Sequence, residues 1–225
     1  MDNPKRDDRK VVFKEKMDWL HDNLQYMGSL VEESIARSIE ALKKQNLELA
    51  QSVIDSDDRI DQMEQQIEEK CLEVIATQQP MAKDLRRVAT LFKIINDLER
   101  MADYAVSISK ITLRIGNQPL IKPLVDIPRM AQLSQRMVKQ ALDSYVREDV
   151  ALAQAVGMDD NEVDNLFGQI FRELLTIMME NPKTITQATH LLFVGRWLER
   201  ISDHATNIAE EVFFLVTGEK KNLNE

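Results

Sequence analysis

The segment 91–108 reads LFKIINDLERMADYAVSI, and the chain repeats it one hundred residues later as LLFVGRWLERISDHATNI. Both copies carry Leu-Glu-Arg-x-x-Asp, so Glu99 and Asp103, like Glu199 and Asp203, stand four residues apart. On a helix, side chains at this spacing project from one face, one turn from each other. Two carboxylates placed in this way repel each other and destabilise an isolated helix by about 0.2–0.5 kcal/mol. A chain that keeps the arrangement twice either neutralises the charges nearby or binds cations there.

Apolar residues recur every three or four positions outward from these segments, which is the spacing of amphipathic helices. The helices predicted from this periodicity span residues 13–44, 47–78, 81–115, 128–146, 150–180 and 182–216. Alternating strand-like runs and Asn-Gly or Asp-Gly turns do not occur. The sequence therefore predicts an all-α fold of six long helices, antiparallel within each half because the connections are short.

Glycine and proline residues interrupt the helical pattern at one place, residues 116–127. Such a cluster is typical of a linker. It divides the chain into two tandem three-helix bundles, residues 13–115 and residues 128–217. The halves resemble each other beyond the opening segments, because many positions in 49–72 match positions 103 residues later. We interpret the chain as an internal duplication of one three-helix unit.

The duplicated positions include a second acidic pair, Asp57 and Asp61, which recurs in the second half. Asp61 lies 19 residues before Pro80 and Glu99 lies 19 residues after it, while Asp57 and Asp103 each lie 23 residues away. In an antiparallel hairpin hinged at this proline, both pairs sit about 28–35 Å from the turn, at about 1.5 Å per residue. The counts in the second half agree to within one residue. Equal height does not by itself make the two pairs face each other.

If the pairs do face each other, four carboxylates converge in each half, and they need a counter-ion or must raise one another's pKa. Oxygen ligands suit Mg²⁺, Ca²⁺ or Mn²⁺, and carboxylate-rich sites also hold iron or zinc. The second half offers two further oxygen ligands where the first half has Ser107 and Lys110, so its site should be richer. The candidate metal ligands are Asp57, Asp61, Glu99 and Asp103 in the first half, and Asp160, Asp164, Glu199, Asp203, Asn207 and Glu210 in the second.

Two alternatives stay open beside a metal-binding protein. The carboxylates can be ordinary charged surface on a helical scaffold, neutralised by Arg100 or Arg87 in salt bridges. A ferritin-like di-iron enzyme is the other alternative, but it needs Glu-x-x-His on each of two helices. The residues three before His21, His190 and His204 are not glutamates, so this motif is missing. We also find no phosphate-binding loop and no nucleophile elbow, and we expect a protein that is not an enzyme.

Composition restricts the compartment and the partners. The net charge of −9 disfavours nucleic acid, because phosphate contacts need a basic surface. The single cysteine, Cys71, cannot form an internal disulfide and fits a reducing compartment. No apolar run approaches the length of about 18–20 residues that a membrane-spanning helix needs, and residues 1–10 lack the apolar core of a signal peptide. We expect a cytoplasmic protein that reaches a membrane only through partners.

Three stretches are similar to the PhoU family of phosphate-specific transport accessory proteins. They are QQPMAKDLR at 78–86, DLERMAD at 97–103 and LERISDHATNIAE at 198–210. The resemblance covers nearly the whole chain, about residues 13–216. The first half departs from the family pattern at Ser107 and Lys110, where Asn and Glu are usual.

The resemblance implies a fold of two three-helix bundles related by a pseudo-twofold axis. It further implies a cytoplasmic negative regulator of phosphate uptake and of the phosphate-starvation response. Such proteins act between the ATP-binding subunit of the phosphate transporter, PstB, and a sensor histidine kinase, PhoR, and many are homodimers. Some members bind metal clusters at Glu/Asp-x-x-x-Asp motifs, which here correspond to Glu99, Asp103, Glu199 and Asp203, with the remaining four aspartates as their partners.

Overall fold

The computed structural model describes residues 4–223 and shows helices joined by short connections in that range, with no strand. The helices are α1 (Pro4–Lys44), α2 (Leu47–Asp55), α3 (Asp58–Gln78), α4 (Lys83–Ile115), α5 (Asp126–Arg147), α6 (Val150–Glu180) and α7 (Ile185–Thr217), the last preceded by a 3₁₀ turn, Pro182–Thr184. The predicted all-α fold is confirmed. Among the described helices, none combines the length and the apolar character needed to cross a bilayer.

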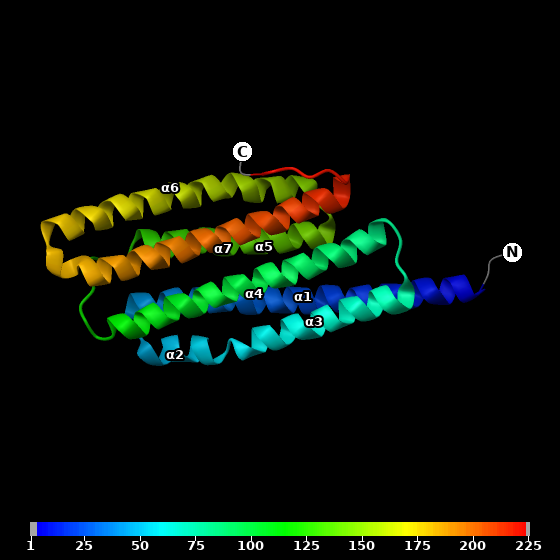
Figure 1. The fold of residues 1–225 in the computed structure, drawn as a ribbon, viewed down its shortest axis with the longest axis horizontal. Helices are drawn as coiled ribbons and strands as arrows, with labels where there is room; N and C mark the ends of the chain where they lie inside the picture. The colour runs from blue at the N-terminus through cyan, green and yellow to red at the C-terminus, as the bar shows by residue number, and fades with distance from the viewer. Residues whose placement is uncertain (1–3, 224–225) are drawn as a thin grey trace.

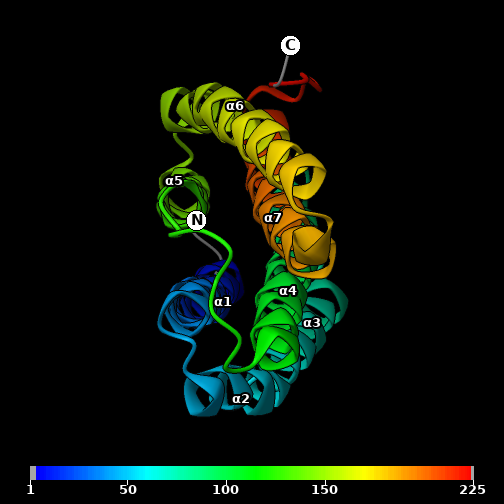
Figure 2. The same ribbon diagram turned by 90° about the vertical axis from the view of Figure 1, so that its left-hand side faces the viewer.

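The helices form two bundles that lie side by side (Figure 1). One contains α1 to α4 and the other contains α5 to α7, and α4 runs antiparallel to α7 where the bundles meet. Seen along the helices, α6, α7, α4 and α3 form one curved layer, and α5 and α1 lie to the left of it (Figure 2). The packing of α1 on α5 is the second contact between the bundles. The two halves therefore share an extensive interface instead of being joined only by the linker.

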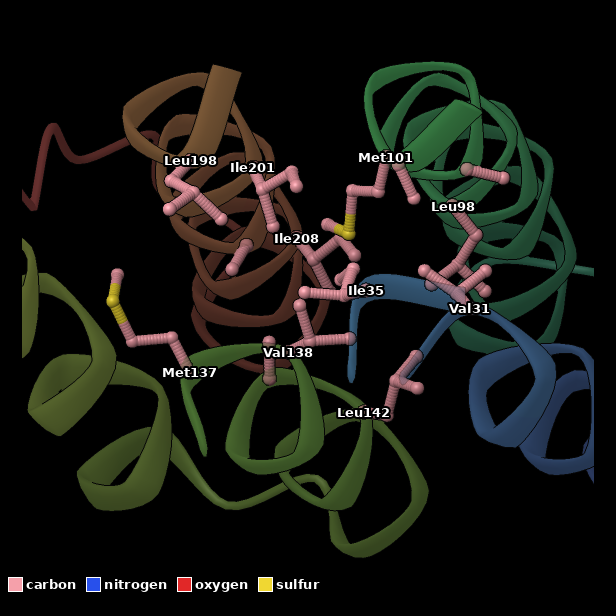
Figure 3. Close-up of a cluster of buried hydrophobic side chains, with 14 of the residues drawn as sticks. Val31, Ile35, Leu98, Met101, Met137, Val138, Leu142, Leu198, Ile201 and Ile208 are labelled. Carbon is pink, nitrogen blue, oxygen red and sulfur yellow. The ribbon is translucent and has the colours of Figure 1, made fainter. Parts of the chain in front are cut away.

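A single hydrophobic core runs through both bundles. Val31 from α1, Met101 from α4, Val138 from α5 and Ile201 from α7 are each 0% exposed and point toward a common centre (Figure 3). Full burial of a side chain of this kind contributes about 1.5–3 kcal/mol to folding. The contact between α1 and α5 is especially close, because a Cβ atom added to Gly28 would lie 2.2 Å from Cδ1 of Leu142.

The prediction of one continuous helix over residues 47–78 is wrong, because α2 ends before α3 begins. The sequence between them is Asp55-Ser56-Asp57-Asp58, and such residues disfavour helix interiors because they bond to the nearby backbone instead. The hydroxyl of Ser56 donates to the carbonyl of Val53 at 2.9 Å. Asp57 occupies the N-cap of α3 but its side chain makes no capping hydrogen bond, which leaves the carboxylate available to the neighbouring helix.

Two connections also differ slightly from the predicted boundaries. The α4 helix begins at Lys83, after Gln79 and Ala82 adopt left-handed φ values of 48° and 47°. Non-glycine residues in this region are uncommon, and sequence periodicity does not reveal them. The α5 helix begins at Asp126, so Pro128 falls in its first turn, where proline is tolerated.

Replacement of Leu98 or Leu198 by alanine should lower the free energy of unfolding by about 2–5 kcal/mol, because each change leaves a cavity in the core. Both leucines are 0% exposed, whereas Leu72 is 54% exposed. The control Leu72→Ala should change stability by less than about 0.5 kcal/mol. Because the core is continuous, calorimetry should show one unfolding transition, and either substitution should lower the melting temperature of that whole transition. Two transitions, of which only one moves, would contradict the continuous core.

Candidate functional site

The first acidic cluster lies between α3 and α4 and consists of Asp57, Asp61, Glu99 and Asp103. Burial, assisted by the carboxylates of Asp61 and Asp103, raises the pKa of Asp57 to about 6. Burial also raises the pKa of Glu99, and Asp103 and Asp61 contribute to that shift. Carboxylates from the two helices are thus close enough to disfavour each other's ionisation. The fold therefore brings the acidic pairs of α3 and α4, which were predicted to share one height, close to each other.

The second acidic cluster repeats this arrangement between α6 and α7, with Asp160, Asp164, Glu199 and Asp203. Asp160 is only 3% exposed. Its burial raises its pKa to about 7, assisted by the charges of Asp164, Asp203 and Glu199. Burial and the charge of Asp203 likewise raise the pKa of Asp164. Asp160 is thus more deeply buried than Asp57, its counterpart in the first cluster.

Arginine side chains neutralise part of the first cluster. Nη1 of Arg100 lies 3.2 Å from Oδ2 of Asp103, and its Nε lies 3.3 Å from Oε2 of Glu99. Arg87, the other candidate counter-ion, pairs instead with Asp84 outside the cluster. Asp57 and Asp61 form no salt bridge among the described residues. The salt bridges of this cluster therefore lie within α4, and Asp57 and Asp61 have none.

The second cluster shows the same asymmetry between its two helices. Arg200 lies 3.2 Å from Asp203, and Arg196 forms an ion pair with Glu199. Both arginines belong to α7, and each stands three residues before the carboxylate with which it pairs. No salt bridge within the described part of the chain reaches the buried carboxyl of Asp160.

One buried carboxyl oxygen in each cluster lacks a hydrogen-bond partner. These atoms are Oε2 of Glu99, whose approach to Arg100 lacks hydrogen-bond geometry, and Oδ1 of Asp160. A buried acceptor without a donor is costly, whereas a cation would satisfy it. The oxygen-only donor set also fits a divalent cation. Within residues 4–223, no three His, Cys, Asp or Glu side chains stand as close together as metal ligands do, so a bound ion would have to draw the carboxylates inward.

The two clusters differ in what lies beside them. The charge of Lys110 lowers the pKa of Asp57 and so opposes the effect of burial. In the second half the residue one hundred positions later is Glu210, and no cation shifts the pKa of Asp160. A lysine beside a carboxylate repels a metal ion and competes with it. The first cluster therefore has a lysine acting on its buried aspartate, whereas Asp160 in the second cluster has no such cation.

Asn207 and Glu210, the two further candidate ligands of the second half, lie on α7 beside α4. Both line a groove between α4 and α7, and Oε1 of Glu210 accepts a hydrogen bond from the backbone N–H of Leu223 at 3.0 Å. The carbonyl oxygen of Leu223 would lie 2.5 Å from a Cβ added to Gly157, so the C-terminal segment packs directly on α6. His204 points to α4 as well, with Nδ1 2.8 Å from Oδ1 of Asp97.

Sequence reasoning missed two charged residues that belong to the clusters. Glu64 adds a carboxylate that raises the pKa of Glu99. Arg196 bonds to Glu199 and lowers its pKa against the effect of burial. Both could have been found, because Glu64 lies three residues after Asp61 and Arg196 lies three before Glu199, which places each on the same helix face as its neighbour.

Comparison with known protein families finds the PhoU domain in both halves, at residues 24–112 and 127–212. A phosphate-specific transport system accessory protein PhoU homolog from Clostridium acetobutylicum is 40% identical over 217 residues, which is 96% of this chain and 99% of that protein. The homolog of the same name from Caulobacter vibrioides is 44% identical over 195 residues, 86% of this chain and 85% of its own.

Solved structures show the same architecture. The crystal structure of PhoU from Pseudomonas aeruginosa superposes with a TM-score of 0.88 at 36% identity, covering 92% of this chain and 100% of that one. The phosphate transport system regulatory protein PhoU from Streptococcus pneumoniae gives a TM-score of 0.86 at 27% identity, covering 93% and 99%.

Replacement of Asp160 by asparagine should stabilise the protein at neutral to alkaline pH and not at pH 4. The pKa of Asp160 is about 7 in the fold, above its unfolded value of about 3.9. The folded state therefore binds the extra proton in this window, and the group lowers the free energy of unfolding as pH rises through it. In a chelating buffer, urea unfolding of Asp160→Asn should show a gain above about 1 kcal/mol at pH 8 and little change at pH 4.

The exposed Glu180 supplies the control for this experiment. Glu180→Gln should change stability equally little at both pH values. An effect of Asp160→Asn that is the same at pH 4 and pH 8 would contradict the raised pKa.

Proposed function

This chain belongs to the PhoU family, and we propose that it is an accessory protein of phosphate-specific transport that works as a negative regulator of phosphate uptake. The observation that carries the proposal is the match of the PhoU domain to both halves, together with relatives of that name along nearly the whole chain. The two acidic motifs that organise the sequence lie within the matched residues.

The regulator acts by binding partners rather than by turnover. Its partners are the ATP-binding subunit of a phosphate transporter, of the PstB type, and a sensor histidine kinase of the PhoR type. It works in the cytoplasm as a homodimer and meets the membrane only through these partners. The resemblance of the motifs supports this assignment, and so does a surface built from long helices, which offers extended faces for docking.

Divalent or transition metal ions bind at the two acidic clusters. Support comes from the convergence of carboxylates across two helices, from their raised pKa values and from the unpartnered oxygens of Glu99 and Asp160. The ion would be held by the four carboxylates of each cluster and would supply positive charge that relieves their repulsion. Mg²⁺, Ca²⁺, Mn²⁺, iron and zinc all accept such ligands.

Deletion of the gene should raise phosphate uptake in cells grown at high phosphate, because the proposed regulator normally represses transport. The measurement is the uptake of radiolabelled phosphate, with the intact gene restored on a plasmid as the control. In parallel, the purified protein should retain the transporter's ATP-binding subunit in a pull-down. Unchanged uptake after deletion, together with no complex, would contradict the proposed regulation.

Metal binding should depend on the acidic motifs and should be stronger in the second half. The double variant Glu199→Gln/Asp203→Asn should lose more bound metal than Glu99→Gln/Asp103→Asn, because the first cluster already has Lys110 beside Asp57. Binding is measured by titration with Mn²⁺, Fe²⁺, Zn²⁺ and Mg²⁺. At a hundredfold excess over the dissociation constant, the bound ion should stabilise the fold by about 2.7 kcal/mol.

The matched double variants remove the same charge, so each serves as a control for the other. If both bind every tested ion and melt as the unaltered protein does, the clusters are charged surface on a scaffold and the metal proposal fails. A greater loss in the first-half variant would reverse the proposed order of the two clusters.

A further inference from the structure

A cavity of about 510 Å³ opens at the end of the molecule where the N-terminal part of α1 meets the start of α4 and the ends of α5 and α7. Figure 1 shows α1 extending beyond the other helices at this end. The cavity is distinct from both acidic clusters, since it shares no residue with them. It is built from both halves of the chain, so it exists only because the two bundles pack together. Its volume is in the range of small-molecule binding sites.

Three cations of the cavity lining form a positive wall without a salt bridge to any of the described side chains. Lys10 and Lys14 stand one turn apart on α1, and Arg147 lies in the last turn of α5. None of these three side chains forms a salt bridge in the part of the chain that the structure describes. Such unpaired cations around a concave site attract an anion, and this contrasts with the net charge of −9 of the whole chain.

The two carboxylates that line the cavity are already engaged. Glu148 accepts a hydrogen bond from Nε of Arg87 at 2.6 Å and also pairs with Lys83. Asp84 accepts from Nη1 of the same arginine at 2.8 Å. These pairs use the charge of Arg87 and leave the lysines and Arg147 as the surplus. An entering anion would therefore meet a positive wall.

The rest of the lining is apolar and aromatic. Phe13 and Met17 share a face of α1 with the two lysines, and Tyr145 adds its ring from α5, with a hydroxyl that is fixed because it donates to the carbonyl oxygen of Arg87 at 3.1 Å. The ring of His21 stands edge-on to Tyr145, with centroids 5.7 Å apart. Burial lowers the pKa of His21, so its ring is neutral near pH 7 and offers one donor and one acceptor nitrogen. A planar, partly apolar group fits between these residues.

We propose that this cavity binds a nucleotide, with its phosphate groups among Lys10, Lys14 and Arg147 and its base against Phe13 and His21. Ammonium and guanidinium groups are the usual phosphate ligands of proteins. Inorganic phosphate would use the cations but leave the apolar and aromatic part of the lining uncovered. An acidic peptide would need an extended groove or a free strand edge, whereas this site is a single cavity of small-molecule size. The proposal is independent of the metal clusters and of the partners proposed above.

The test is a titration of the full-length protein with a fluorescent ADP analogue in a chelating buffer, so that the acidic clusters hold no metal. Binding should saturate at one site per chain, and unlabelled ADP should compete at least about tenfold better than either inorganic phosphate or adenosine. Lys14→Gln/Arg147→Gln should weaken binding at least about tenfold, because two charge-assisted contacts are lost. Phe13→Ser should weaken binding of ADP without changing competition by inorganic phosphate.

The control variant Lys43→Gln/Arg114→Gln removes the same charge from exposed positions outside the cavity and should bind like the unaltered protein. Thermal melting of each variant checks that it folds. The proposal would be overturned if ADP showed no saturable binding at millimolar concentration, or if ADP and inorganic phosphate bound with equal affinity. It would also be overturned if the cavity and control variants lost the same ADP affinity, or if an acidic peptide displaced the fluorescent analogue and unlabelled ADP did not.

Discussion

The packing of α4 against α7 determines where the charged side chains of both acidic clusters lie. Leu98 and Leu198 are fully buried, and the glutamate that follows each is turned by about 100° around its helix. Burial of each leucine contributes about 1.5–3 kcal/mol, whereas repulsion between carboxylates one turn apart costs about 0.2–0.5 kcal/mol. The core therefore fixes the rotation of both helices, and the carboxylates must stay at its edge.

This constraint explains why the protein tolerates acidic side chains that it only partly compensates. The arginines of α4 and α7 reach the carboxylates of their own helix, because residues three apart share a face. They do not reach across to Asp57 or Asp160, whose pKa values are about 6 and 7. Each cluster thus combines an internally paired helix with an opposing carboxyl whose ionisation is disfavoured, which shows as its raised pKa.

The sequence predicted the architecture and the common height of the carboxylates, but neither that they face each other nor what surrounds the clusters. Periodicity and the constant rise of a helix were sufficient to bring Asp61 and Glu99 to one height. The break between α2 and α3 and the left-handed Gln79 depend on local backbone geometry, which apolar periodicity does not record. The packing of α4 on α7, and the docking of Leu223 on α6, are contacts between distant segments. No local pattern encodes such contacts.

Duplication gave the chain two copies of one unit, and the structure shows where the copies diverged. At Asp57 the helix is interrupted, the carboxyl is half-buried and Lys110 acts on it. At Asp160 the helix continues and the side chain is 3% exposed, with no cation acting on its pKa. The free energy that a cation gains from carboxylates includes the relief of their repulsion, and a nearby lysine provides part of that relief in advance. Asp160 therefore keeps its proton to a higher pH than Asp57, although the two motifs are the same.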